Sequence, residues 1–333
     1  MDLDAFVAEH GGEWNRLQQL LGRRRRRLSA AEVDELVMLY RRTATHLSVV
    51  RSRSPDPALV AWLSRLVLQA RGAVTPATGF SLAAVGRFFA VSFPAAVYRA
   101  ARWWVGVAAA FLTVSGVLMA LVATQPDRAL VFLSQPEIDQ IVRHDFEAYY
   151  SQAPPPNFAA LVWTNNAWIS ALCLASGVLI LPVLLVLWSN ALNLGVIGGI
   201  MIGHGRSDVF FGLITVHGLL ELTCVFIAAG VGLRIGWAWI APGRRRTRAQ
   251  ALAETARAGS VVALGLVVAL GVSGLVEAFV TPAPLPAGPK IAFGASVWLG
   301  FLIYVVGYGA AASAQGSSGD VAEHERAATA PMA

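Results

Sequence analysis

The sequence predicts an all-α, polytopic helical membrane protein with about six spans and a small cytoplasmic helical N-terminal domain. Hydrophobic residues form 56% of the 333 residues and charged residues only 14%, against about 25% charged in an ordinary soluble domain. The charges are also uneven, because residues 1–102 carry 15 Arg and 8 Asp or Glu. This pattern excludes a single soluble globule, a disordered chain and a disulfide-rich secreted scaffold.

Residues 1–78 are expected to form the cytoplasmic helical domain. Its first helix is indicated by apolar residues at helical spacing, namely Phe6, Trp14, Leu17, Leu20 and Leu21. Ser29 and Glu32 form a capping box that opens a second helix, and the Pro55-Asp-Pro57 sequence precedes a third. Because the first apolar run long enough to span starts near Trp103, no signal peptide is expected and the N-terminus should stay in the cytoplasm.

Residues 79–102 have a different pattern, in which aromatic and aliphatic side chains are interrupted by single arginines. This pattern is typical of an amphipathic helix that lies in the membrane interface, with its arginines reaching the lipid headgroups. The sequence Arg102-Trp-Trp104 then combines positive charge with an aromatic belt. We therefore expect the first span to begin at residue 103.

The transmembrane domain is predicted over residues 103–310, since about 20 helical residues cross the hydrocarbon core. The expected spans are residues 103–122, 168–188 (with a kink at Pro182), 190–203, 209–240, 261–280 and 291–310. The third is short, so it is either a broken helix that crosses or a re-entrant segment. The acidic loop that ends near residue 166 suits the outside, with a short amphipathic helix over 136–150. The tail over 311–333 should be disordered.

Two arginine clusters, near residues 25 and 245, set the orientation. Positively charged segments resist translocation, so both clusters should be cytoplasmic and an even number of crossings should separate them. We therefore expect six crossings in the plasma membrane, with both termini cytoplasmic. The net charge of +6 is explained in the same way, and no nucleic-acid-binding module is recognisable.

Three ionisable residues fall inside predicted spans, where their cost makes each a candidate functional residue. His217 and Glu221 are four residues apart and therefore share a helix face, and Glu277 lies near the outer end of the fifth span. They could form a proton, ion or metal site or a catalytic acid–base set. The alternative, which the spacing favours, is a hydrogen-bonded clamp that fixes how two helices pack.

In two segments, glycines at four-residue spacing form a stripe without side chains along one helix face. The stripes are Gly195, Gly199 and Gly203 in the first segment, and Gly232 and Gly236 in the second. Small residues let helix backbones approach closely within a membrane. The stripes therefore predict close packing within the chain or a homodimer, and spacing alone does not separate the two.

Enzyme and cofactor motifs are not recognisable in the sequence. The zinc-protease, phosphate-loop, dinucleotide and nucleophile-elbow patterns are missing, so no catalytic residue, cofactor or metal is assigned. Cys173 and Cys224 both lie in apolar runs and are expected to be small buried hydrophobic residues. We therefore expect a protein that is not an enzyme.

Several stretches resemble the stage II sporulation protein M family of membrane proteins. In the N-terminal part they are Phe6 to Leu17, Leu36 to Arg42 and Leu47 to Arg53, and in the membrane part Asn190 to Gly199, His217 to Glu221, Ala228 to Gly236 and Glu277 to Pro282. The N-terminal match resembles the longer, non-sporulation branch. The resemblance implies a non-enzymatic integral membrane protein. In spore formers the family member is a scaffold for sporulation proteins D and P, and relatives are often encoded near MoxR-type ATPases.

Two functions from different classes follow. The leading hypothesis is a scaffold that organises cell-envelope or MoxR-type ATPase-associated partners through its N-terminal helices and outer loop, with a homodimer as one arrangement. The alternative is a transporter or channel that uses His217, Glu221 and Glu277, with the broken 190–203 segment lining a cavity.

Overall fold

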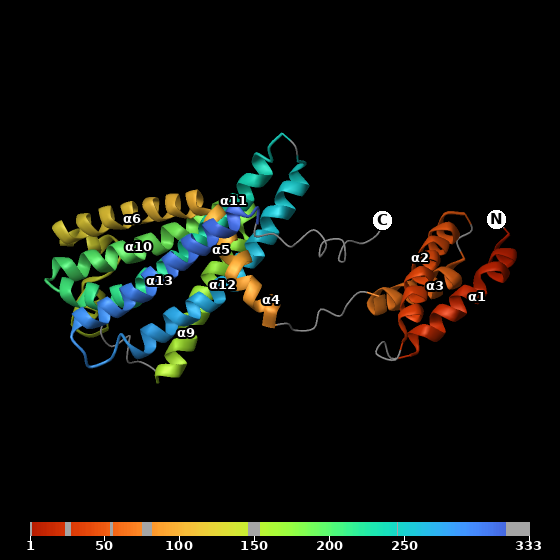
Figure 1. The fold of residues 1–333 in the computed structure, drawn as a ribbon. Helices are drawn as coiled ribbons and strands as arrows, with labels where there is room; N and C mark the ends of the chain where they lie inside the picture. Colours follow the sequence, from red (N-terminus) through yellow and green to blue (C-terminus); the bar gives the residue numbers. More distant parts are fainter. Residues whose placement is uncertain are drawn as a thin grey trace. The chain divides into compact units, whose positions relative to one another are not determined.

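The computed structural model describes residues 2–23, 28–53, 56–74, 82–145, 154–244 and 246–317. Every regular element in these ranges is a helix, so the all-α prediction is confirmed. The chain divides into two compact units, an N-terminal one up to Leu82 and a membrane-spanning one from Ala83 (Figure 1). Within the described residues, six helices of the second unit are long and apolar enough to cross a membrane, as predicted.

The N-terminal unit contains three helices that pack against one another: α1 (Leu3–Leu21), α2 (Ala30–Arg53) and α3 (Pro57–Val74). Their shared core is centred on Trp14, Leu17 and Leu63, each at most 2% exposed. The predicted capping box opens α2: the Ser29 N–H donates to Glu32 Oε2 at 2.8 Å, and the Glu32 N–H donates to Ser29 Oγ at 3.3 Å. Residues 24–27, 54–55 and 75–81 of this region lie outside the described residues.

The six spanning helices alternate in direction. They are α6 (Ala101–Thr124), α9 (Pro155–Ala175), α10 (Leu181–Gly203), α11 (Ser207–Ile240), α12 (Arg248–Phe279) and α13 (Ala287–Ala314). α11 is the most buried and contacts all five others. At the far end of α6 lie the short helices η3 (Pro126–Val131), α7 (Gln135–Gln140) and η4 (Ile141–Asp145). α7 and η4 cover the first part of the surface helix predicted over 136–150, and residues 146–153 are not described.

The second and third spans are divided differently from the sequence prediction. α9 begins at Pro155 and ends at Ala175, and the turn falls at Ser176–Ile180 instead of near residue 189. Ile180 has a φ of 60°, which no regular helix accepts. Pro182 lies in the first turn of α10, where its missing N–H costs no hydrogen bond. The expected kink at Pro182 and the short or broken helix over 190–203 were therefore wrong, because 190–203 is the second half of a regular helix.

The predicted interfacial helix is also different. Its described part consists of α4 (Leu82–Arg87), the π-helix η2 (Phe88–Ser92) and α5 (Phe93–Arg99), and α5 packs against α13 and α12. Phe93 is 2% exposed and Val97 is fully buried, which a helix lying on lipid would not achieve. Residues 82–92 remain largely at the surface, whereas residues 93–97 and residue 100 belong to the core of the bundle. The first apolar residues of the bundle therefore precede residue 103.

A hydrogen bond from α13 explains how η2 is tolerated. In η2 the Phe93 N–H bonds to the Phe88 carbonyl, five residues back. The next carbonyl, that of Phe89, would need the N–H of residue 94 in this pattern, and Pro94 has none. The Tyr304 hydroxyl donates to the Phe89 carbonyl at 2.5 Å. The side chain thus replaces the missing backbone donor and ties η2 to α13.

Candidate membrane-embedded polar site

The three ionisable residues predicted inside the membrane meet in the structure. His217 and Glu221 lie one turn apart on α11, and Glu277 lies in the last turn of α12. One ligand atom from each, an imidazole nitrogen or a carboxylate oxygen, lies within 4.8 Å of the other two. His217 and Glu277 are 6% and 3% exposed. The sequence placed His217 and Glu221 on one face, and only the packing of α12 against α11 adds Glu277.

Neighbouring helices orient these side chains. Asn166 of α9 donates its amide to Glu221 Oε1 and to the Val162 carbonyl. The Ser273 hydroxyl of α12 donates to the His217 carbonyl at 3.2 Å. His217 Nδ1 lies 3.3 Å from the Thr281 hydroxyl, just after α12. These contacts hold the imidazole and one carboxylate in place from two sides.

Glu277 is the least satisfied member of the cluster. Its Oε1 lies 3.8 Å from His217 Nε2, which is too long for a hydrogen bond. Its Oε2 is buried and has no hydrogen-bond partner among the described residues. A buried carboxylate oxygen without a partner is costly. The arrangement therefore leaves a position for a proton or a cation beside Glu277.

The cluster faces a pocket of about 490 Å³ within the membrane-spanning unit. Besides the three ionisable side chains, the polar part of its lining comes from Asn165, Asn166 and Asn193. The apolar part comes from Ile141, Val162, Leu194, Ile197, Ile214 and Leu222. Such a volume accommodates a cation with several water molecules. An imidazole and two carboxylates are ligands that suit divalent metals such as Zn²⁺ and Mn²⁺.

Arg234 does not join this cluster. It lies 17 residues beyond His217 on the same helix, which corresponds to about 25 Å along the axis. The polar pocket and the arginine-rich end of the bundle are therefore separate sites.

The predicted glycine stripes pack within the chain. A methyl group built on Gly199 would lie 2.8 Å from the Met119 carbonyl oxygen, and one on Gly195 would lie 2.7 Å from Leu118 Cβ, so this stripe faces α6. Gly203 approaches Ala123, which also belongs to α6. In the second stripe, Gly232 lies against the Cys173 carbonyl oxygen, and a methyl group on Gly236 would lie 2.5 Å from the Gly177 carbonyl oxygen. Close contact between backbones in one chain thus accounts for both stripes.

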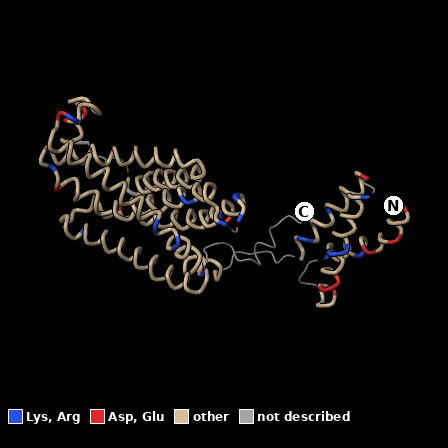
Figure 2. Tube along the Cα trace, turned by 90° about the horizontal axis from the view of Figure 1, so that it is seen from above, with Lys and Arg blue, Asp and Glu red and all other residues tan. Residues whose placement is uncertain are grey.

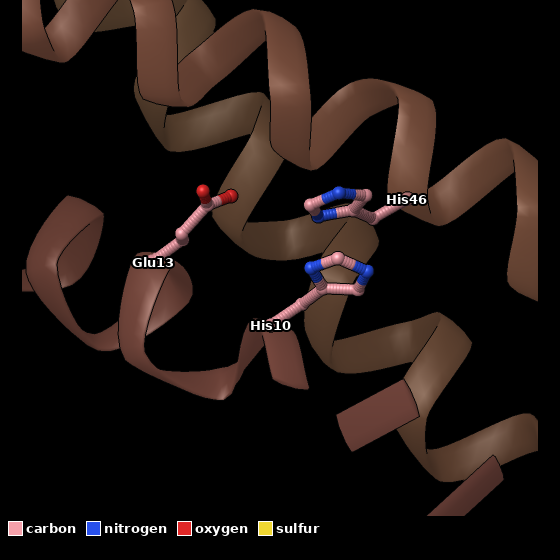
Figure 3. A group of neighbouring side chains, drawn as sticks. All are labelled: His10, Glu13 and His46. Atoms are coloured by element: carbon pink, nitrogen blue, oxygen red, sulfur yellow. The ribbon is translucent and has the colours of Figure 1, made fainter. Parts of the chain in front are cut away.

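A second group of ligand-type side chains was not predicted. In the N-terminal unit, His10 and Glu13 of α1 face His46 of α2, and their ligand atoms also lie within 4.8 Å of one another (Figure 3). The two imidazole rings are stacked with centroids 4.0 Å apart. The Trp14 indole N–H donates to His46 Nδ1 at 3.1 Å, and Arg42 pairs with Glu13 at 2.6 Å.

The surroundings of His46 in this group disfavour its protonated form. Burial lowers its pKa, and the nearby His10 lowers it further. The signal that could have identified the group is the three-residue spacing of His10 and Glu13, which places them on one helix face. The partner on α2 is fixed only by tertiary packing.

The fold and the buried polar site define a polytopic helical membrane protein with ionisable groups inside its bundle. The stage II sporulation protein M family matches residues 105–282, more than half of the chain. The chain belongs to this family, as its resemblance implied. Residues 4–76 match a separate domain of unknown function, DUF8413. No curated protein and no solved structure matches the chain.

Proposed function

We propose that the membrane-spanning unit binds a divalent cation at His217, Glu221 and Glu277, and that this site serves transport or gating across the bilayer. The observation that carries the proposal is the buried Glu277 carboxylate, which lines the pocket. Its Oε2 atom has no hydrogen-bond partner among the described residues. A packing clamp would instead bond its polar atoms to one another, since unpaired groups in lipid are costly.

The proposal makes the cluster a binding site. Asparagine amides and aliphatic side chains complete its described lining. The charge argument points the same way. Two carboxylates this close in a medium of low polarity need either a proton or a positive counter-charge, and a divalent cation supplies the counter-charge.

Cation binding can be tested on the purified protein in nanodiscs. With ZnCl₂ or MnCl₂ at 100 times the Kd, the bound cation stabilises the fold by about 2.7 kcal/mol, which raises Tm by roughly 5–10 °C in a domain of this size. Glu277→Gln should remove both the binding heat and the shift in Tm. Glu254→Gln is the matched control, since Glu254 is a partly exposed residue of the same helix, lies outside the pocket lining and pairs with Arg246.

Two outcomes would contradict the proposal. One is a wild-type protein whose Tm and binding heat respond to neither cation. The other is equal binding by wild type and Glu277→Gln. If binding is established, cation flux into proteoliposomes then separates a transporter from a static site.

A second proposed role, as a scaffold, is supported by the N-terminal unit. This unit has its own core and matches a different domain family from the membrane-spanning unit. An appended domain of this kind suits recruitment of cell-envelope or MoxR-type ATPase-associated proteins. Deleting residues 1–78 should then abolish co-purification of partners while the membrane unit still inserts, and retained partners would count against this role.

The proposed orientation places both termini in the cytoplasm of a plasma-membrane protein. Support comes from the end of the bundle where α5 and α11 end and α6 and α12 begin, which holds Arg99, Arg102, Arg234, Arg244, Arg246 and Arg248. Figure 2 shows basic residues gathered there, and Arg246 pairs with Glu254. At the opposite end, acidic and basic residues are mixed. Positive charge favours the cytoplasmic side. Cysteine labelling at residue 284 from outside, without labelling at residue 243, is expected, and the reverse pattern would refute this orientation.

A further inference from the structure

Three arginines gather around a fourth, Arg234, at the arginine-rich end of the membrane-spanning unit. Arg99 ends α5, Arg102 opens α6, Arg234 lies in the last turns of α11, and Arg246 precedes α12. The first two and Arg246 lie close enough to Arg234 for their positive charges to act on it. Arg246 pairs with Glu254 at 2.7 Å.

Among the residues that the structure describes, the other three arginines have no such partner. No ion pair or hydrogen bond joins Arg99, Arg102 or Arg234 to any residue that the structure describes. Arg234 is nevertheless half-buried. Like charges clustered around a half-buried guanidinium favour a bound counter-anion, and the described residues do not provide one.

An apolar groove begins at this arginine cluster. It has a volume of about 400 Å³ and lies between α6 and α10, with Arg102 and Trp103 at one end and Val114 toward the other. From Arg102 to Val114 the helix rises about 18 Å, slightly more than the 15 Å or so of hydrocarbon in one leaflet. The groove therefore has the length of a single acyl chain.

The walls of the groove suit an acyl chain as well. Gly106 and Ala110 leave α6 narrow, and Leu184 and Leu187 of α10 form the opposite wall. A methyl group built on Gly106 would meet nothing within 4 Å, so the groove is open at that point. Trp103 packs near Trp237, with ring centroids 6.1 Å apart, at the end where the aromatic belt of a membrane protein meets the headgroups.

We infer that this groove binds one anionic phospholipid, with an acyl chain along α6 and α10 and the headgroup phosphate at Arg99, Arg102 and Arg234. Guanidinium groups bind phosphate through charge-assisted hydrogen bonds. A zwitterionic lipid fills the groove equally well but adds no net negative charge to the cluster. The site therefore selects its lipid by charge.

The test is native mass spectrometry of the full chain released from nanodiscs that contain equal amounts of phosphatidylglycerol and phosphatidylcholine. The wild-type protein should retain phosphatidylglycerol preferentially. Arg102→Gln should reduce that preference about fivefold, the effect of one basic residue at an anionic surface. Arg128→Gln, at the other end of α6, should leave it unchanged. Equal retention of both lipids by the wild type would overturn the inference.

A second pair of variants tests the groove itself and does not depend on removing charge. Gly106→Leu fills the groove and should abolish retention of phosphatidylglycerol. Gly116→Leu is the matched control, because a methyl group there also meets nothing within 4 Å but residue 116 does not line the groove. Equal loss in both variants, or loss in neither, would contradict an acyl-chain site. Displacement of the bound lipid by millimolar inorganic phosphate alone would also contradict it, since that result assigns the arginines to a free anion.

Discussion

Replacing Gly232 by alanine tests a close helix crossing in the membrane-spanning unit. At this crossing the backbone of α11 lies directly against the end of α9 and the turn that follows it. A methyl group at residue 232 would overlap the carbonyl oxygen of Cys173. Since the obstacle is backbone, which cannot rotate away as a side chain can, the two helices must separate.

The cost follows from what separation does to the packing. Overpacking a well-packed site costs about 1–3 kcal/mol, and the upper end applies because Gly236 and Gly177 of the same crossing also lose their contacts. In a domain of more than 150 residues, 3 kcal/mol lowers Tm by about 6–12 °C. The expected result for Gly232→Ala is a fall of that size in thermal unfolding followed by tryptophan fluorescence in detergent.

Gly116→Ala provides the control for this measurement. It lies in α6 with open space around a built methyl group, so the better helix propensity of alanine should leave Tm unchanged or raise it slightly. If the two variants unfold at the same temperature, the close crossing of α9 and α11 is wrong. If Gly232→Ala instead changes only the mass of the particle in solution, the stripe mediates dimerisation and not packing within the chain.

Three further predictions concern single contacts. Tyr304→Phe should destabilise the membrane-spanning unit by about 1 kcal/mol, since the Phe89 carbonyl loses its donor, and an unchanged Tm would refute the role given to that hydroxyl. Ser29→Ala should lower the stability of the N-terminal unit by about 1 kcal/mol through loss of the cap, measured by chemical denaturation, whereas Ser52→Ala should have little effect. The lowered pKa of His46 means that its contribution to stability is complete above the unfolded pKa of about 6.5 and is lost as the pH falls through and below that value. Circular dichroism of wild type and His46→Gln over pH 8 to 5 checks this, and an acid-induced loss that is identical in both would exclude His46 as its cause.

The number of spans and the class of protein could be predicted from the sequence because both depend on composition along the chain. A long apolar run such as Trp103–Val122 is stable only when it is removed from water, either in lipid or in a protein core. The capping box at Ser29 and Glu32 was equally predictable, since its partners are three residues apart. The boundary between the second and third spans was not, because the apolar sequence continues through Ser176–Ile180, where Gly177 packs against Gly232 and Ile180 takes a positive φ.

The polar site shows the same division. Four-residue spacing on one helix was enough to place His217 beside Glu221. The position of Glu277 and Asn166 next to them depends on how α12 and α9 cross α11. The same limit explains why the group formed by His10, Glu13 and His46 was missed. The segment over 93–100 was assigned to the membrane surface because single arginines, Arg87, Arg99 and Arg102, interrupt the apolar sequence in and around it, although its apolar face packs against α13.

By itself, the sequence determined which segments leave water, because hydrophobic transfer is a sum over neighbouring residues. It also determined which side chains carry charge into the bundle. Only the tertiary structure decided which helices touch, which glycines permit that contact, and which buried charges meet. The reason is that in lipid the helices gain little by hiding apolar surface from one another, so their arrangement depends on shape and on polar contacts between residues far apart in the chain.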